Sequence, residues 1–150
     1  MIRFRTTLSR TSALALVLAL LPPLGCAKRG NELVIGEYGS LTGSTATFGI
    51  STKNGIELFM DNVNAAGGIG GVKVRVIVED DQSKPEEAAT AVTKLIDQDG
   101  AIAVLGEVAS SRSMAAAPYC QQAGVPMINP SSTNPKVTEI GDHIFRVCYL

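Results

Sequence analysis

The feature that most constrains this 150-residue chain is a regular alternation of short apolar segments with segments of helical periodicity. Turns rich in Gly, Ser or Pro separate the two kinds of segment. Such alternation is typical of a parallel sheet with helices on both faces, because parallel neighbours need a crossover connection. The sequence therefore predicts an α/β, Rossmann-like fold. Strands are expected at 33–41, 72–78, 101–105, 125–128 and 144–147, and helices at 50–66, 83–99 and 111–124.

The helical segments carry recognisable apolar faces and end signals. One apolar face of the first helix is expected at Ile56, Phe59, Met60 and Val63. In the second helix, Ser83 and Glu86 have the spacing of a capping box. Its buried face is expected at Ala88, Ala91, Val92 and Leu95. Pro118 should kink or shorten the third helix, because proline removes a helical hydrogen bond.

The first 26 residues have the composition of an export signal. Three arginines and no acidic residue precede a nine-residue apolar run at 13–21, which is too short to span a bilayer. Leu24-Gly25-Cys26 resembles the end of a bacterial lipoprotein signal, in which the cysteine is lipidated, although Pro23 stands where that signal has leucine. Ordinary cleavage after Ala27 is the alternative. In both cases residues 27–32 form a linker, and residues 33–150 form a domain outside the cytoplasm, in the periplasm or cell envelope.

The charge pattern argues against nucleic-acid binding, and the cysteine content leaves one possible disulfide. Removing the signal's three arginines leaves ten basic residues against fourteen acidic ones, a net charge of −4. Basic residues are scattered and do not interleave with aromatic ones, so a nucleic-acid surface is not expected. Cys120 and Cys148 could pair in an oxidising compartment, but two unpaired small apolar residues are the favoured interpretation.

Clustered hydroxyl residues follow two of the predicted strands. Ser110 and Ser111 stand where a helix begins, and free backbone N–H groups together with the helix dipole favour an anion there. Ser131 and Thr133 lie in a Pro-bounded loop whose carbonyls can accept from an ammonium and whose hydroxyls can donate to a carboxylate. An ordinary N-cap and an ordinary turn are the structural alternatives. Because carboxyl ends of parallel strands share one sheet edge, the two loops together predict a site for a zwitterion.

Other candidate motifs carry less chemistry. The Gly-rich segment 67–71 follows a helix and precedes a strand, the reverse of the order in a dinucleotide-binding fingerprint. His143 has no second ligand or triad partner, and Asp80-Asp81 is expected to be a solvated turn or a helix cap rather than a metal site. No acid–base residues are expected to gather at the strand ends. The sequence thus predicts no cofactor, no metal and no enzymatic activity, and a nucleotide-dependent Rossmann enzyme is the disfavoured alternative.

Several segments in this order resemble the leucine/isoleucine/valine-binding class of type I periplasmic binding proteins. They are LVIGEYGSLTGSTATFG, the AAGGIGG–strand–DDQSKP segment, GEVASS, AGVPMINPSSTNP and HIFRV. The resemblance extends from Glu32 to Leu150. It implies two α/β lobes that close on a ligand and deliver it to an ABC permease. Because members are commonly more than twice this long, the chain is expected to be an N-terminal lobe whose second lobe is absent.

The resemblance also assigns roles to residues. Ser110 matches a serine that contacts the ligand's carboxylate, and Phe48 matches an aromatic residue near the ligand's side chain. Ser131 and Thr133 match loop positions where a backbone carbonyl meets the ammonium and the threonine's hydroxyl and amide also reach the ligand. Leu, Ile or Val is the preferred ligand of an amino-acid importer. A ligand sensor of the same fold, for amides, urea or aromatic acids, is the alternative.

Overall fold

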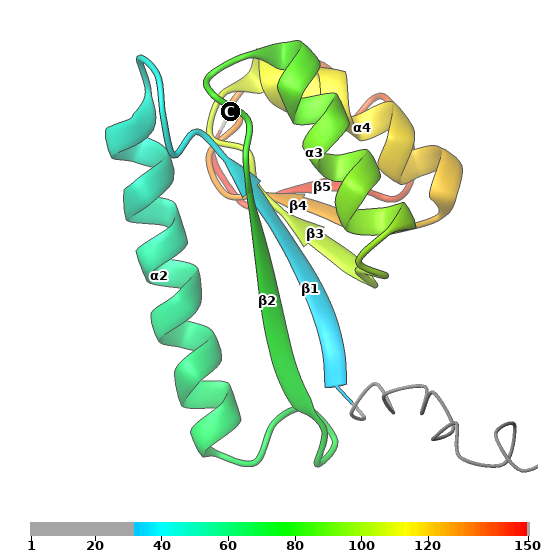
Figure 1. The fold of residues 1–150 in the computed structure, drawn as a ribbon. Coiled ribbons are helices and arrows are strands. Elements are labelled where there is room, and N and C mark those ends of the chain that lie inside the picture. The colour runs from blue at the N-terminus through cyan, green and yellow to red at the C-terminus, as the bar shows by residue number, and fades with distance from the viewer. Residues whose placement is uncertain (1–31, 150) are drawn as a thin grey trace, which may run out of the picture. The chain divides into compact units, whose positions relative to one another are not determined.

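The computed structural model describes residues 32–149, which form a five-stranded, fully parallel sheet with three α-helices (Figure 1). Strand order across the sheet is β2-β1-β3-β4-β5. This confirms the predicted α/β fold with a parallel sheet. In chain order the elements are β1 (Glu32–Gly39), α2 (Ala46–Ala65), β2 (Lys73–Asp80), α3 (Pro85–Asp97), β3 (Ala103–Leu105), α4 (Ser110–Ala123), β4 (Met127–Asn129), the 3₁₀ turn η2 (Pro135–Val137) and β5 (Ile144–Arg146).

Helices cover the two faces of this sheet unequally. Helix α2 lies along β1 and β2 on one face, whereas α3 and α4 lie side by side on the other (Figure 1). Successive side chains of β1 alternate between these faces: Tyr38 packs with residues of α3 and α4, and its neighbour Glu37 faces Lys53 and Glu57 of α2. The strand is therefore buried on both faces, as expected for a central parallel strand.

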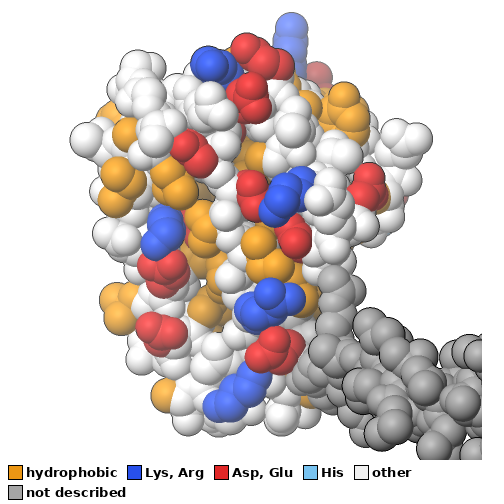
Figure 2. Space-filling view, in the orientation of Figure 1, with side chains coloured by type: hydrophobic (Ala, Val, Ile, Leu, Met, Phe, Trp, Pro, Cys, Tyr) orange, Lys and Arg blue, Asp and Glu red, His pale blue; other side chains and the backbone are white. Residues whose placement is uncertain are grey.

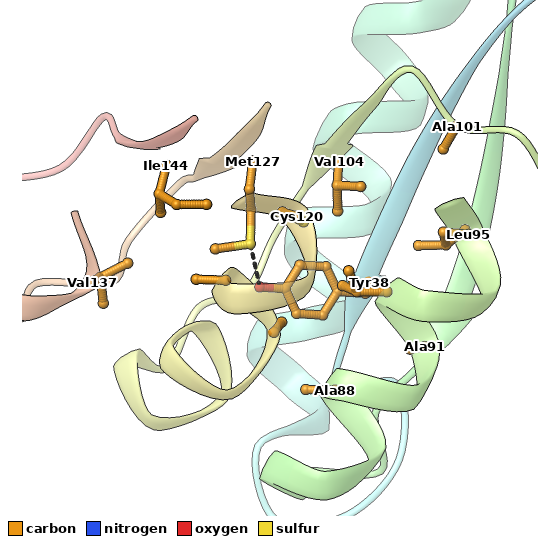
Figure 3. Packing of buried hydrophobic residues seen from close by; sticks show 13 residues of the cluster. Tyr38, Ala88, Ala91, Leu95, Ala101, Val104, Cys120, Met127, Val137 and Ile144 are labelled. Carbon is orange, nitrogen blue, oxygen red and sulfur yellow. Dashed lines mark hydrogen bonds between the residues drawn. The ribbon is translucent and has the colours of Figure 1, made fainter. Parts of the chain in front are cut away.

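The main hydrophobic core lies between the sheet and the helices α3 and α4 (Figure 3). Helix α3 contributes the four predicted residues Ala88, Ala91, Val92 and Leu95, which are all buried. Tyr38 is only 1% exposed, and its hydroxyl donates to Sδ of Met127 at 3.3 Å. Small residues on α3 and α4 let the two helices approach closely, which explains the high alanine content.

Several local predictions are corrected by the structure. Helix α2 begins at Ala46 rather than at residue 50, so Phe48 lies in its first turn and not in a loop. On the predicted apolar face of α2, Phe59 is 62% exposed, whereas the other three members are half-buried. Helix α4 runs through Pro118 without being shortened, because the residues around this exposed proline are held by packing against α3.

Ser83 does not form the predicted capping box. Lys84 occupies the N-cap position of α3, and no side chain caps the helix there. Ser83 has a positive φ of 62° and directs its hydroxyl to the loop before α2, where it donates to the carbonyl of Thr42 at 2.9 Å. Ser83 thus connects the loop before α3 to the loop before α2 and does not cap α3.

A close backbone approach fixes the start of α2 against the end of β1. A Cβ atom on Gly49 would lie 2.0 Å from the carbonyl oxygen of Ser40, so only glycine fits at this position. Gly49 is also the buried residue of α2. The first turn of α2 is therefore held beside the carboxyl end of the sheet.

Acidic and basic side chains are interspersed on the face shown in Figure 2, and apolar side chains lie between them over α2. The large exposed apolar residues of α2 are Phe48, Ile50, Leu58 and Phe59. Within residues 32–149, no helix is long and apolar enough to cross a membrane.

Candidate functional site at the carboxyl edge of the sheet

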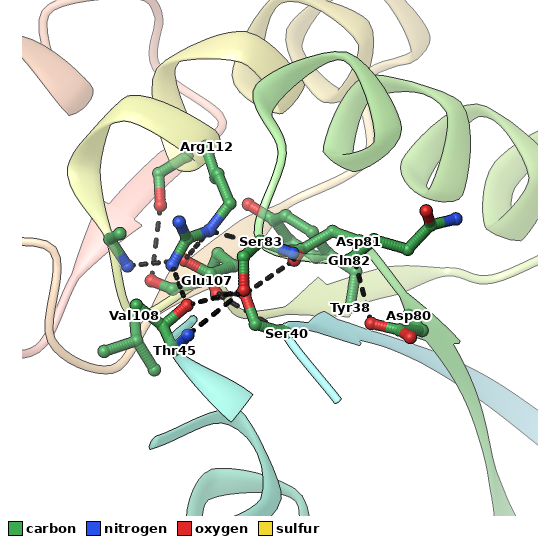
Figure 4. Close-up of polar contacts among 12 residues, drawn as sticks. Tyr38, Ser40, Thr45, Asp80, Asp81, Gln82, Ser83, Glu107, Val108 and Arg112 are labelled. Atoms are coloured by element: carbon green, nitrogen blue, oxygen red, sulfur yellow. Dashed lines mark hydrogen bonds and ion pairs between the residues drawn. The ribbon is translucent and has the colours of Figure 1, made fainter. Parts of the chain in front are cut away.

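The loops that follow β1, β2, β3 and β4 meet at the carboxyl edge of the sheet, where the sequence predicts a ligand site (Figure 4). All buried polar residues of the described chain except Glu37 lie at this edge. They are Ser40, Asp81, Glu107, Arg112, Ser113, Asn129 and Ser132. The edge therefore combines backbone ends with polar side chains, in contrast to the apolar core beneath it.

Ser110 and Ser111 form the first turn of α4. The N-cap position belongs to Ala109, so Ser110 does not serve as the ordinary N-cap that was the structural alternative. Its Oγ instead accepts a hydrogen bond from the backbone N–H of Asn134 at 3.1 Å, which ties the helix start to the loop after β4. Ser111 is exposed. The helix start thus presents hydroxyls and first-turn N–H groups where an anion is favoured.

The loop after β4 lies against the same helix start. The Ser131 hydroxyl donates to the carbonyl of Val108 at 3.4 Å. Ser132 is buried, and its hydroxyl is 2.6 Å from that of Ser113. Thr133 is exposed, and its carbonyl accepts from Nη1 of Arg146 at 3.0 Å. The structure therefore brings the two predicted hydroxyl clusters together.

Phe48 reaches this region from a different element. It stands in the first turn of α2 and is 61% exposed. The described residues hold no direct hydrogen bond between this turn and the loop after β4, but Thr45 connects the turn to α4 through Nη2 of Arg112 at 2.9 Å. Phe48 is thus an exposed aromatic side chain close to the carboxyl edge.

A buried charged cluster at this edge was not predicted. Nε of Arg112 lies 3.0 Å from Oε2 of Glu107 and 3.7 Å from Oδ2 of Asp81. Both carboxylate side chains are 0% exposed, and that of Arg112 is 7% exposed. The expectation that no acid–base residues gather at the strand ends is therefore wrong, and Asp81 is not a solvated turn residue. Burial, together with the neighbouring Glu107, raises the pKa of Asp81 against the hydrogen bond from Ser40.

Asp80 and Ser83 hold the loop between β1 and α2. Oδ1 of Asp80 accepts from the backbone N–H groups of Leu41 at 2.9 Å and Thr42 at 3.2 Å, and the Thr42 hydroxyl donates to Oδ2 at 2.6 Å. Burial works against the charged form of Asp80, but these hydrogen bonds outweigh it and lower the pKa. Asp80 therefore anchors the loop before α2.

The remaining sequence candidates lie away from this edge or carry no further chemistry. The Gly-rich segment 67–71 forms the turn between α2 and β2, at the opposite edge of the sheet (Figure 1). Cys120 is buried and Cys148 partly buried, and neither is in a disulfide.

His143 pairs with its neighbour at an exposed position, where its Nδ1 is 3.0 Å from Oδ1 of Asp142. Over residues 32–149, no group of His, Cys, Asp and Glu has the arrangement of a metal site. The predicted lipidation site, Cys26, lies outside the described residues.

Comparisons with known proteins agree with this architecture. Residues 32–149 match the family described as periplasmic binding protein. An amino acid binding protein of Pseudomonas aeruginosa is 42% identical over 118 residues, covering 78% of this chain and 32% of the relative. The Leu/Ile/Val-binding protein homolog 3 of Brucella melitensis is 33% identical over 118 residues, which cover 78% of this chain and 32% of that protein.

Solved structures give the same result. The branched-chain amino acid transporter substrate binding protein LivJ of Streptococcus pneumoniae, in complex with isoleucine, matches with a TM-score of 0.77 at 36% identity, over 79% of this chain and 34% of that one. A solute binding protein of Rhodopseudomonas palustris BisB5, in complex with 3,4-dihydroxy benzoic acid, matches with a TM-score of 0.72 at 28% identity, over 77% of this chain and 31% of that one.

The chain spans about a third of the length of the curated relatives it matches (32% for the Pseudomonas and Brucella proteins). The family match extends from β1 to beyond β5. The family resemblance predicted from the sequence is confirmed, and with it the α/β lobe. The chain belongs to the periplasmic binding protein family.

Proposed function

We propose that this protein is the substrate-binding protein of an ABC importer and that it captures an amino acid, with leucine, isoleucine or valine as the preferred ligand. The observation that carries this proposal is the joining of the start of α4 to the loop after β4 by the hydrogen bond from Asn134 N–H to Ser110 Oγ at 3.1 Å. A ligand's carboxylate placed there would meet first-turn N–H groups and serine hydroxyls. Related proteins named for Leu/Ile/Val binding support the choice of ligand.

Each predicted site residue receives a role in this proposal. Ser110 and Ser111 bind the carboxylate, and the hydroxyl of Thr133 also donates to the ligand. The carbonyl of Ser131 accepts from the ammonium; we assign this role to Ser131 because the carbonyls of Ser132 and Thr133 already accept from Arg146. Phe48 contributes an exposed aromatic surface for an apolar ligand side chain.

Aromatic acids are the second candidate ligand class. Two solved relatives were crystallised with hydroxylated benzoic acids, and their identities to this chain are 28% and 27%. Such ligands share the carboxylate and lack the ammonium. They would therefore use Ser110 and Ser111 but not the carbonyl of Ser131. No acid–base chemistry is assigned to the protein in either case.

The export signal completes the proposal. Residues 1–26 direct the protein out of the cytoplasm, and lipidation of Cys26 anchors it to the membrane beside its permease. Replacing Cys26 by Ala should release the protein from the membrane fraction into the soluble one. Retention of that variant in the membrane fraction would contradict lipid anchoring and leave the choice of ligand untouched.

Calorimetric titration of the full-length protein, stripped of bound ligand by unfolding and refolding, identifies the ligand. The panel contains Leu, Ile, Val, Phe, Ala, 4-hydroxybenzoate, an aliphatic amide, urea and NAD. We expect micromolar or tighter binding of an aliphatic amino acid. Ser110→Ala and Thr133→Ala should each weaken it about tenfold to a hundredfold, the loss expected for a hydrogen bond to a charged group.

Thr90→Ala is the matched control, because Thr90 is exposed on α3 and its hydroxyl bonds only to the carbonyl of Glu86. It should leave the affinity unchanged. Binding of the benzoate alone would move the protein to the second ligand class. Binding of NAD alone would refute solute capture for import.

A further inference from the structure

The buried charges at the carboxyl edge are costly to the fold. Asp81 and Glu107 are fully buried with a single guanidinium, that of Arg112, between them. Taking charged groups out of water carries a penalty that pairing offsets only in part, and apolar residues in such places are often as stable or more so. Two carboxylates with one cation are an especially expensive arrangement. Stability alone therefore does not account for this cluster.

Arg112 connects three loops at the edge (Figure 4). From the first turns of α4, its Nη2 donates to Oγ1 of Thr45 at 2.9 Å, just ahead of α2. Its Nε pairs with Glu107, which follows β3, and lies near Asp81, which follows β2. The planar guanidinium offers several donors in fixed directions, so one side chain can hold all three segments in register.

Those segments also carry the proposed ligand residues. Thr45 stands directly before the helical turn that contains Phe48, and Arg112 follows Ser110 and Ser111 in the first turn of α4. The carbonyl of Glu107 accepts from the Ser132 hydroxyl at 2.8 Å, in the loop of Ser131 and Thr133. The cluster thus contacts every proposed ligand-binding segment and contains none of the proposed ligand-binding residues.

The cluster also sets the charge behind the anion site. Glu107 accepts a hydrogen bond from the backbone N–H of Ala109 through Oε2, so a carboxylate already lies at the start of α4. A second negative charge, from a ligand's carboxylate, is disfavoured beside it unless a cation compensates. Arg112, at 3.0 Å from the same oxygen, is that cation. Without Arg112, the carboxylate of Glu107 and the carboxylate of the ligand would lie near the start of α4 with no compensating cation.

We propose that Arg112 is a positioning residue for ligand binding, which acts through Glu107, Asp81 and Thr45 to align the loop before α2 with the start of α4 and to compensate the charge behind the carboxylate site. This inference rests on the proposed function, since it concerns affinity for a carboxylate-bearing ligand. Arg112 itself does not touch the ligand.

Titration of the full-length protein and its variants with L-leucine, and with 4-hydroxybenzoate in parallel, tests this role. The temperature is one at which circular dichroism shows every variant to be folded. Arg112→Met should weaken binding about tenfold, within the range of coupling expected for residues that contact no ligand. Arg112→Lys keeps the positive charge but loses the planar guanidinium with its several donors, so its affinity should lie between those of Arg112→Met and the unmodified protein. Arg75→Met is the matched control, because Arg75 is half-exposed on β2 and pairs with Glu32.

A second readout separates positioning from simple stability. Hydrogen exchange of the amides at 41–48 should become faster in Arg112→Met while exchange in the core strand β1 stays slow. If Arg112→Met does not fold, Thr45→Val removes the acceptor of the 2.9 Å hydrogen bond and should weaken binding by a smaller factor in the same direction.

The possible failures are distinct. If the unmodified protein binds neither of these probes nor any other amino acid of the panel, the proposed function is wrong, and the positioning role falls with it. If it binds another amino acid of the panel, that amino acid replaces L-leucine in the comparison of variants. If it binds a probe and neither Arg112→Met nor, where that variant does not fold, Thr45→Val changes the affinity beyond twofold, the positioning role is refuted and the proposed function stands. A loss of thermal stability without a loss of affinity would show that the cluster is only structural.

Discussion

Glu37 gives the protein a stability that depends on pH. Its side chain leaves β1 on the face covered by α2, and the residue is 1% exposed. Oε2 has no hydrogen-bond partner within the described chain. On α2, Nζ of Lys53 is 2.6 Å from Oε1 of Glu57. Burial, and secondarily the negative charge of Glu57, raises the pKa of Glu37 from 4.5 to about 7, although Lys53 opposes this.

The sign of the effect follows from this shift. Because the folded state holds the proton of Glu37 more tightly than the unfolded chain does, the free energy of unfolding should fall as pH rises from about 4.5 to about 7. At about 1.4 kcal/mol per unit of pKa, the full shift would cost about 3 kcal/mol. Because the shift comes chiefly from the burial of Glu37, screening of the Lys53–Glu57 pair changes this value little.

Glu37→Gln removes the charge and keeps the shape of the side chain. At pH 8 the variant should therefore be about 3 kcal/mol more stable than the unmodified protein, and the difference should shrink to about 1 kcal/mol at pH 5. Urea unfolding followed by circular dichroism at a series of pH values measures it. Glu139→Gln, at an exposed position before β5, is the control and should change the free energy of unfolding by less than about 0.5 kcal/mol at either pH. A Glu37→Gln difference that is the same at pH 5 and pH 8 would refute the reasoning.

Two further predictions concern packing and thiol chemistry. Leu95→Ala, in the core between α3 and the sheet, should lower the free energy of unfolding by about 2–5 kcal/mol, whereas Leu58→Ala, 66% exposed on α2, should change it by less than about 0.5 kcal/mol in the same urea titration. Burial raises the pKa of the Cys120 thiol to about 12, so this cysteine should resist iodoacetamide at pH 8.5 until the protein unfolds, while Cys148 reacts in the folded state. Peptide mass spectrometry distinguishes the two thiols, and equal labelling of both would contradict the burial of Cys120.

Patterns of hydrophobicity were enough to predict the fold, because each strand and helix was encoded in its own segment. The buried face of α3 follows directly from the spacing of four apolar residues, and all four are buried. Predictions failed where a distant segment changed the local preference. Phe59 has the correct spacing for the apolar face of α2, yet it is 62% exposed on a helix that packs against only β1 and β2. Ser83 has the spacing of a cap, yet it bonds to the loop 41 residues before it.

The hydroxyl-rich loops were predictable for a related reason. A strand of a parallel sheet ends at the ligand edge whatever its neighbours are, so Ser110 and Ser131 could be placed there without knowing the strand order. Their joining through Asn134 and Val108 needs β3 and β4 to be adjacent, and consecutive strands usually are. The roles assigned to these residues towards a ligand remain proposals.

The charged cluster needed a further step, which is the strand order itself. Asp81 looks like a solvated turn residue in the sequence, and Glu107 looks like part of a loop. Because β1 lies between β2 and β3, the residues that follow those two strands meet over the end of β1. The register pairs Gly39 with Asp80, and Ser40, one residue further, donates to Asp81 at 2.7 Å and to Glu107 at 3.2 Å through its hydroxyl. Two carboxylates that converge on one buried serine require a cation, and Arg112, in the first turns of the helix that follows β3, is the arginine that reaches both. A charged residue immediately after a strand of a parallel sheet is therefore assigned to solvent only after the neighbouring strand ends have been considered.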